Sequence, residues 1–215
     1  MKIYAINGSP RKTWNSAKML DYFVKGVLSV EEDAEIQLIN LYDYTYTGCK
    51  SCFSCQRKNG MQLECAVKDD IHDILQEAFT SDGIVFASPI YFMDITAQLR
   101  GFLERLMYPG VSLKCISTAF IYTMNATEQQ SKDFNLVATL ATSKSYLEHT
   151  FHSELEQIFA YYTYQYKNYD DYRASFWNEP EKKMWRKTQF PIDCQNAFEA
   201  GKRMVEKIRG ISKDE

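Results

Sequence analysis

Two short segments of the chain combine side chains in a way that suits a bound anion and a planar ligand. The first segment is Gly8-Ser9-Pro10-Arg11-Lys12-Thr13-Trp14-Asn15-Ser16, directly after an apolar run. Hydroxyl donors come from three of its residues, Ser9, Thr13 and Ser16. Arg11 can add charge-assisted hydrogen bonds, and a helix capped by Asn15 would aim free backbone N–H groups at the same place. The segment therefore predicts a site for a terminal phosphate.

Two common phosphate-binding motifs do not match this segment. The Gly-Lys-Ser/Thr ending of the nucleotide P-loop is absent, and so is the Gly-x-Gly-x-x-Gly of dinucleotide sites. Without the glycines that let a pyrophosphate approach the backbone, a single phosphate is favoured. The alternative interpretation is an ordinary polar turn that caps a helix.

The second segment is Ile84-Val85-Phe86-Ala87-Ser88-Pro89-Ile90-Tyr91-Phe92, an apolar run that ends in a turn. Pro89 stiffens the turn, and the amides of Ile90, Tyr91 and Phe92 would be free to bond the edge of a ring. Tyr91 and Phe92 offer aromatic walls, although both residues would also suit a hydrophobic core. Together the two segments predict one phosphorylated planar ligand held between them.

A third loop, Thr123-Met124-Asn125-Ala126-Thr127, is expected to close this pocket. Asn125 and Thr127 can donate hydrogen bonds to a ring. Asn125 could instead cap the helix that follows.

Alternating strands and helices position these loops. Strands are predicted at residues 2–6, 35–41, 84–87, 114–123 and 159–165. Helices are predicted at residues 15–27, 69–79, 95–107, 146–158, 181–186 and 193–208. This alternation predicts an α/β fold, a parallel sheet with helices on both faces, in one domain spanning residues 1–215. In such a sheet the loops after the strands meet at one edge, where ligands bind.

Composition narrows the class of partners. The chain has 215 residues and a net charge of −3, which provides no basic surface for nucleic acid. No apolar run approaches the ~20 residues of a membrane span, and no signal peptide is apparent. We therefore expect a cytoplasmic protein in which the six cysteines remain reduced.

Four motifs make the chain resemble a known family. They are Gly-Ser-Pro-Arg-Lys-x-x-Asn-Ser, a Cys-x-x-Cys-x-x-Cys segment ending in Cys-x-x-x-Asp-Asp, Ser-Pro-Ile-Tyr-Phe, and Gln-x-x-x-Phe-x-x-Arg. From residue 1 to about residue 107 the chain resembles the flavodoxin-like NAD(P)H-dependent FMN reductases, in particular the branch with the iron–sulfur flavoproteins. The resemblance implies a three-layer fold with a five-stranded sheet in the order 2-1-3-4-5, bound FMN, and homodimers or homotetramers.

The resemblance also implies roles for residues that match the motifs. The phosphate would be held by Ser9, Arg11, Asn15 and Ser16. The flavin ring would be lined by Ser88, Pro89, Ile90, Tyr91, Phe92 and Met93. Thr123, Met124 and Asn125 would lie in the third loop, which lacks the glycines that are usual in the family.

The activity implied is that of an enzyme that takes hydride from NAD(P)H onto FMN. The acceptor would be a small molecule, namely a quinone, a flavin, or a nitro or azo compound. No catalytic acid or base is expected, because hydride transfer needs none and the protein has only to hold the ring. Two alternatives are an electron carrier with FMN and a [4Fe-4S] cluster, and a non-enzymatic flavin-binding regulator.

The cysteine segment bears on these alternatives. Cys49, Cys52 and Cys55 have the spacing of three ligands to a [4Fe-4S] cluster, and Cys65 would be the fourth ligand. The long polar gap before Cys65 departs from cluster-bearing relatives, so we expect these thiols to be mainly structural. We also expect His72 to be solvated. The Tyr-rich run 161–172 is expected to end the last strand and form a loop. Alternatively it forms a lid over the flavin or part of a subunit interface, where tyrosine is favoured.

Overall fold

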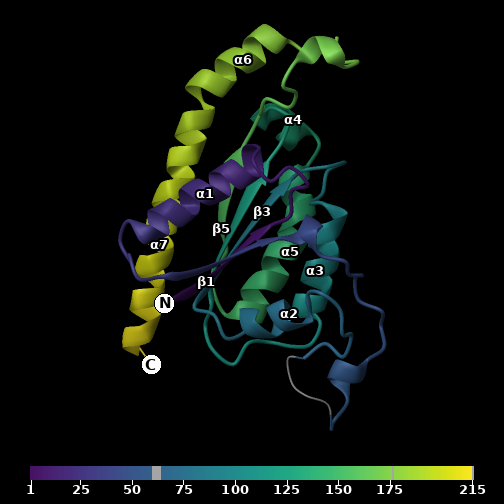
Figure 1. The fold of residues 1–215 in the computed structure, drawn as a ribbon, viewed down its shortest axis with the longest axis vertical. Coiled ribbons are helices and arrows are strands. Elements are labelled where there is room, and N and C mark those ends of the chain that lie inside the picture. Colours follow the sequence, from purple (N-terminus) through teal and green to yellow (C-terminus); the bar gives the residue numbers. More distant parts are fainter. Residues whose placement is uncertain (60–63, 176, 215) are drawn as a thin grey trace.

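The computed structural model describes residues 1–59, 64–175 and 177–214. Within them, the strands of one parallel sheet are β1 Lys2–Asn7, β2 Glu35–Asn40, β3 Gly83–Pro89, β4 Ser117–Thr123 and β5 Glu156–Ala160. Their order is β2-β1-β3-β4-β5, which confirms the expected topology (Figure 1). Because all strands run the same way, the loops after β1, β3 and β4 lie at one end of the sheet.

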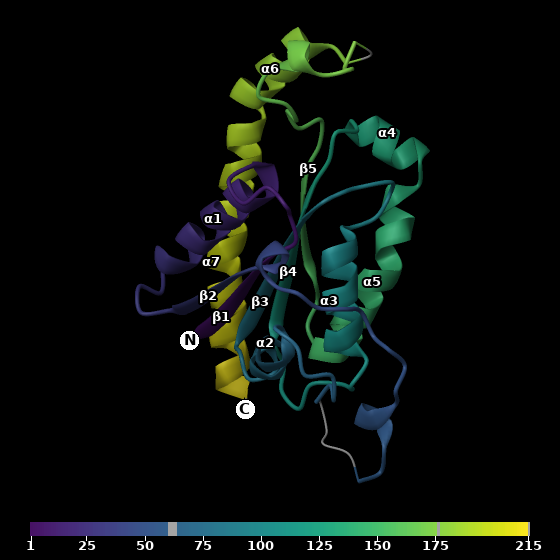
Figure 2. The same ribbon diagram turned by 45° about the vertical axis from the view of Figure 1, so that its right-hand side comes forward.

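Helices cover both faces of the sheet (Figure 2). The helices on one face are α1 Asn15–Leu28 and α7 Phe190–Asp214. Those on the other face are α2 His72–Ala78, α3 Ala97–Met107 and α5 Leu136–Phe151. Each face has its own buried apolar cluster, so the strands are covered on both sides.

Helices α1 and α7 approach each other closely because glycines lie at their contact. A Cβ atom at Gly26 would lie 1.9 Å from the carbonyl oxygen of Phe198, and one at Gly201 would lie 2.1 Å from that of Phe23. Real Cβ atoms do not approach so near, so any side chain at either position would force the two helices apart.

The predicted boundaries are wrong after β4. The sequence indicates a helix at 146–158 and a strand at 159–165, but α5 ends at Phe151 and β5 covers Glu156–Ala160. His152 ends the helix in a left-handed conformation, with φ 53°. The aromatic residues that suggest a strand form the loop after β5 instead. An additional helix, α4 Glu128–Asp133, begins at a capping box of Thr127 and Gln130, so Asn125 does not cap it.

Smaller differences concern single residues. Asn15 is the first residue of α1 rather than its cap, since Trp14 occupies the cap position. His72 is buried, and its Nε2 lies 2.6 Å from Nζ of Lys68. In the C-terminal part, α6 covers Glu179–Thr188. No helix among the described residues is both long and apolar enough to cross a membrane.

Candidate functional site

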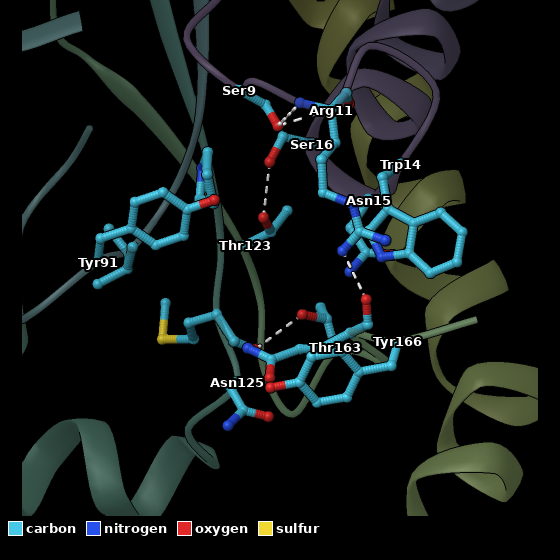
Figure 3. Close-up of a pocket in the computed structure, with 14 residues that line it drawn as sticks. Ser9, Arg11, Trp14, Asn15, Ser16, Tyr91, Thr123, Asn125, Thr163 and Tyr166 are labelled. Carbon is cyan, nitrogen blue, oxygen red and sulfur yellow. Dashed lines mark hydrogen bonds between the residues drawn. The ribbon is translucent and has the colours of Figure 1, made fainter. Parts of the chain in front are cut away.

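A cavity of about 200 Å³ lies where β1, β3 and β4 end (Figure 3). Most residues predicted for the site line it, and these are Ser9, Arg11, Asn15, Ser16, Pro89, Ile90, Tyr91, Thr123, Met124 and Asn125. The three loops singled out in the sequence therefore meet at one pocket.

The loop between β1 and α1 is held in shape by its own polar groups. The backbone N–H of Ser9 donates to Oδ1 of Asn7 at 3.0 Å, and that of Arg11 donates to Oγ of Ser9 at 3.2 Å. The hydroxyls of Ser16 and Thr123 lie 2.7 Å apart, which joins this loop to the end of β4. Ser9, Ser16 and the start of α1 thus form a compact, pre-organised place for an anion.

Arg11 places its charge at the mouth of this pocket. Its Nη1 donates to the backbone oxygen of Gln165 at 2.5 Å, and its guanidinium lies 4.1 Å from the centre of the Trp14 ring. Stacking and hydrogen bonding together fix the plane of the guanidinium, so that it can meet a phosphate with little loss of side-chain entropy.

The pocket is also lined by four residues that the sequence did not predict for the site. They are Trp14, Thr163, Gln165 and Tyr166. Three of them follow β5. The backbone oxygen of Tyr164 accepts from Nε1 of Trp14 and from Nδ2 of Asn15, each at 3.0 Å. The Tyr-rich run at residues 161–172 was the one feature of the sequence that could have indicated a role for this segment in the pocket. Its first residues form a loop that contacts the start of α1.

Two cations of α6, one buried and one partly buried, lie behind the pocket lining. Lys182 is fully buried, and its Nζ lies 3.4 Å from the carbonyl oxygen of Asn125 and 3.3 Å from that of Thr163. Burial lowers the pKa of Lys182 to about 8. Arg186 donates to Oδ1 of Asn15, and burial lowers the pKa of its guanidinium. The sequence predicted a helix here but gave no sign that it contacts the site.

The charge of the site follows from these positions. Among the described residues that line the pocket there is no Asp or Glu, while Arg11 lines it and two cations contact its walls. The pocket is thus suited to an anionic ligand.

Four predicted residues do not reach this pocket. Thr13 lines a different cavity, between α1 and β2. Ser88 is fully buried, and its hydroxyl donates to the carbonyl of Pro89 and accepts from the N–H of Thr96. Phe92 points into solvent, and neither it nor Met93 lines the cavity.

The turn after β3 explains the position of Phe92 and Met93. Tyr91 and Asp94 exchange both backbone hydrogen bonds, which leaves these two residues at the tip of a hairpin with φ 48° and 71°. The sequence predicted that the amides of Ile90 and Tyr91 would be free, and this prediction is wrong. They donate to the backbone oxygens of Thr123 and Asp94. From this corner, Pro89, Ile90 and Tyr91 line the pocket, and burial raises the pKa of the Tyr91 hydroxyl.

The cysteine segment lies at the other end of the molecule (Figures 1 and 2). Cys49, Cys52, Cys55 and Cys65 are free thiols that border one cavity of about 20 Å³. Arg105 borders the same cavity. It is 1% exposed and donates to Oδ2 of Asp69 at 2.5 Å and to the carbonyl of Val67 at 2.9 Å.

The cavity does not fit a cluster as it stands. Its volume of about 20 Å³ leaves room for about one water molecule. No group of three or more His, Cys, Asp or Glu side chains in the described part of the chain is arranged to hold a metal ion. Burial, with the neighbouring thiols, raises the pKa of Cys55, as expected for closely packed protonated thiols.

Comparison with known proteins gives a family and a fold. Residues 1–161 match the model of a family described as NADPH-dependent FMN reductase. An iron-sulfur flavoprotein from Archaeoglobus fulgidus is 32% identical over 110 residues, which cover 51% of this chain and 47% of that protein. The chain thus spans about half the length of the curated relatives it matches.

Solved structures agree on the fold. An NAD(P)H:quinone oxidoreductase from Methanothermobacter marburgensis superposes with a TM-score of 0.66 at 13% identity, covering 95% of this chain and 97% of the other. An azoreductase from Bacillus anthracis superposes with a TM-score of 0.65 at 11% identity, covering 94% and 99%. At these identities the likeness concerns the flavodoxin-like fold alone.

Proposed function

Because the chain belongs to the NADPH-dependent FMN reductase family, we propose that it passes electrons from a nicotinamide nucleotide through FMN to a small acceptor. The acceptor class is a quinone, a flavin, or a nitro or azo compound. The observation that carries the proposal is the pocket at the carboxyl ends of β1, β3 and β4. It combines a preformed anion site, an aromatic wall and no lining carboxylate among the described residues.

The residues divide by the part of FMN they would hold. Ser9, Arg11, Asn15 and Ser16 suit the phosphate, since their hydroxyl, guanidinium and amide donors surround the start of α1. Pro89, Ile90 and Tyr91 would lie beside the ring, and the loop after β4 would form the third wall. When bound, FMN supplies the redox chemistry, and this chain's residues bind it, orient it and leave one face accessible.

Two separate measurements test this proposal: one identifies the bound cofactor, and the other asks whether a nicotinamide nucleotide reduces it. The cofactor released from gently purified protein is expected to have the mass of FMN, and either NADH or NADPH is expected to bleach its absorbance without oxygen. Release of FAD would contradict the single-phosphate site. FMN that neither nucleotide bleaches would favour a flavin-binding regulator.

A second candidate function is that of an electron carrier with FMN and a [4Fe-4S] cluster. Its support is that four thiols border one cavity, together with the name of the relative from Archaeoglobus fulgidus. The small size of the cavity favours a structural role instead. Protein prepared without oxygen that carries about four iron and four sulfide per chain would establish this candidate. Protein without iron would leave the thiols as structural residues.

We further propose a cytoplasmic homodimer or homotetramer. Size-exclusion chromatography with light scattering measures the mass directly. A monomer at micromolar concentration would contradict the proposal.

A further inference from the structure

A second cavity, of about 240 Å³, lies between the loops after β4 and β5 and the helices α6 and α7. It shares no lining residue with the pocket described above. Its walls include three aromatic side chains, Tyr161, Tyr162 and Trp185, and three acidic ones, Glu128, Glu181 and Asp193. No Lys or Arg lines it in the described part of the chain. Its charge is therefore opposite to that of the first pocket.

Asp193 is the residue that points to a ligand. It is 5% exposed, and its Oδ1 accepts from Nε2 of Gln189 at 2.8 Å. Its Oδ2 is buried and has no hydrogen-bond partner among the described residues. Burial raises the pKa of this carboxyl, and the hydrogen bond from Gln189 offsets only part of that effect. A buried carboxylate oxygen without a donor is costly, so a ligand that brings a donor and a positive charge would be stabilised there.

The aromatic wall is already fixed in place. Nε1 of Trp185 donates to the backbone oxygen of Tyr161 at 3.0 Å, and the Trp185 and Tyr162 rings meet edge to face with centroids 6.0 Å apart. The hydroxyl of Tyr162 donates to Oε2 of Glu181 at 3.2 Å, which orients that carboxylate at the more exposed side. Such rings attract cations through their π faces.

One cation already lies close to this wall. Nζ of Lys182 is 3.8 Å from the centre of the Tyr162 ring. It is bound by the carbonyls of Asn125 and Thr163 and does not line the cavity. Since it occupies a face of Tyr162, the rings left for a ligand are those of Trp185 and Tyr161.

We propose that this cavity binds a small organic cation, in which an amidinium, guanidinium or ammonium group is attached to a flat apolar body. The cationic group would donate to Oδ2 of Asp193, and the body would lie against Trp185. Glu181 attracts the cation from the more exposed rim, where Glu128 is already paired with Lys132 at 2.7 Å. The proposal does not depend on the redox reaction or on FMN.

Benzamidinium and benzamide form a matched pair of probes, because they share shape and differ in charge. Titration calorimetry of the flavin-loaded protein at pH 7.5 is expected to show saturable binding of benzamidinium. Benzamide should bind at least roughly tenfold more weakly. Asp193→Asn should weaken benzamidinium by roughly tenfold or more, and Glu181→Gln by a smaller factor. Asp33→Asn, which removes the same charge from an exposed loop, should change nothing.

Glu181→Gln keeps the test decisive if Asp193→Asn does not fold, because Glu181 is exposed. The proposal is overturned if benzamidinium does not bind, or if benzamide binds equally well. It is also overturned if binding is the same in the wild type, Glu181→Gln and every folded Asp193 variant.

Discussion

Arg11 and Gln165 lie 154 residues apart in the chain, yet Nη1 of Arg11 donates to the backbone oxygen of Gln165. This bond, and the two that Trp14 and Asn15 make to Tyr164, join the loop after β1 to the loop after β5. The anion site thus depends on a segment that no local motif marks as part of it.

Arg11→Ala is expected to weaken FMN by roughly ten- to a hundredfold, because a charge-assisted hydrogen bond worth ~1.5–3 kcal/mol is lost. Riboflavin, which has no phosphate, should bind almost as well as before. Fluorescence titration of the apoprotein with both ligands measures the difference. Lys12→Ala is the matched control, since Lys12 is the neighbouring cation, pairs with Asp43 and does not line the pocket. Equal losses for both ligands would show that Arg11 acts on the loop or on the fold.

Lys182→Met is expected to change how stability depends on pH. The pKa of Lys182 is about 8 in the folded protein, below its ordinary 10.5. Between these values the unfolded chain binds more protons than the folded chain, so the contribution of Lys182 to stability rises with pH. The full difference is on the order of 3 kcal/mol.

Urea unfolding of the wild type and Lys182→Met at pH 7 and pH 9.5 tests this expectation. The stability of the wild type relative to the variant should increase at the higher pH. Comparison with the variant removes the contribution of the tyrosines other than Tyr162, whose ring contacts Lys182. A relative stability that stays constant or falls would refute the lowered pKa.

The hairpin tip at Phe92 and Met93 is expected to be strained, because both residues adopt positive φ. Asn and Gly tolerate this conformation far better. The double substitution Phe92→Asn, Met93→Gly should therefore stabilise the protein by about 1–2 kcal/mol. Thermal unfolding measures the gain. FMN affinity should stay within about threefold, and a larger loss would mean that the tip contributes to the site after all.

Gly201→Ala is expected to destabilise the fold by about 2 kcal/mol or more, because the new methyl group would collide with the Phe23 carbonyl in α1. Gly210 lies in the same helix, and a Cβ atom there would meet nothing within 4 Å. Gly210→Ala should thus stabilise the protein by up to ~1 kcal/mol through helix propensity. Chemical denaturation of both variants gives the comparison. Similar effects of the two substitutions would contradict the tight α1–α7 contact.

Replacing Cys49, Cys52 and Cys55 together by Ser is expected to leave FMN binding and NAD(P)H oxidation intact, with some loss of stability. These thiols border a small cavity, and their segment lies at the other end of the molecule from the carboxyl ends of β1, β3 and β4 (Figure 1). Flavin content, steady-state rates and thermal unfolding of the triple variant are the measurements. Loss of NAD(P)H oxidation with the flavin retained would show that the segment takes part in electron transfer.

The sheet was predictable because its strands are short apolar runs that end at polar turns, and the first two site loops follow such runs. The end of β5 was not predictable in the same way. Tyr161–Tyr166 has the composition of a strand, and only tertiary contacts, such as the bond from Tyr162 to the Ala126 backbone, keep it in a loop. Ser88 and Phe92 show a second limit of prediction from the sequence, which concerns side-chain direction. A motif predicts where a turn occurs, but the direction of each side chain depends on hydrogen bonds made across the turn.

The contacts of α6 have a consequence for how the protein acquires its cofactor. Lys182 and Arg186 lie beyond residue 161, where the match to the family ends, yet they bind Asn125 and Asn15 in the walls of the pocket. Tight flavin capture should therefore require α6 to be docked on these walls, so that undocking of this helix controls how readily the cofactor is gained or lost.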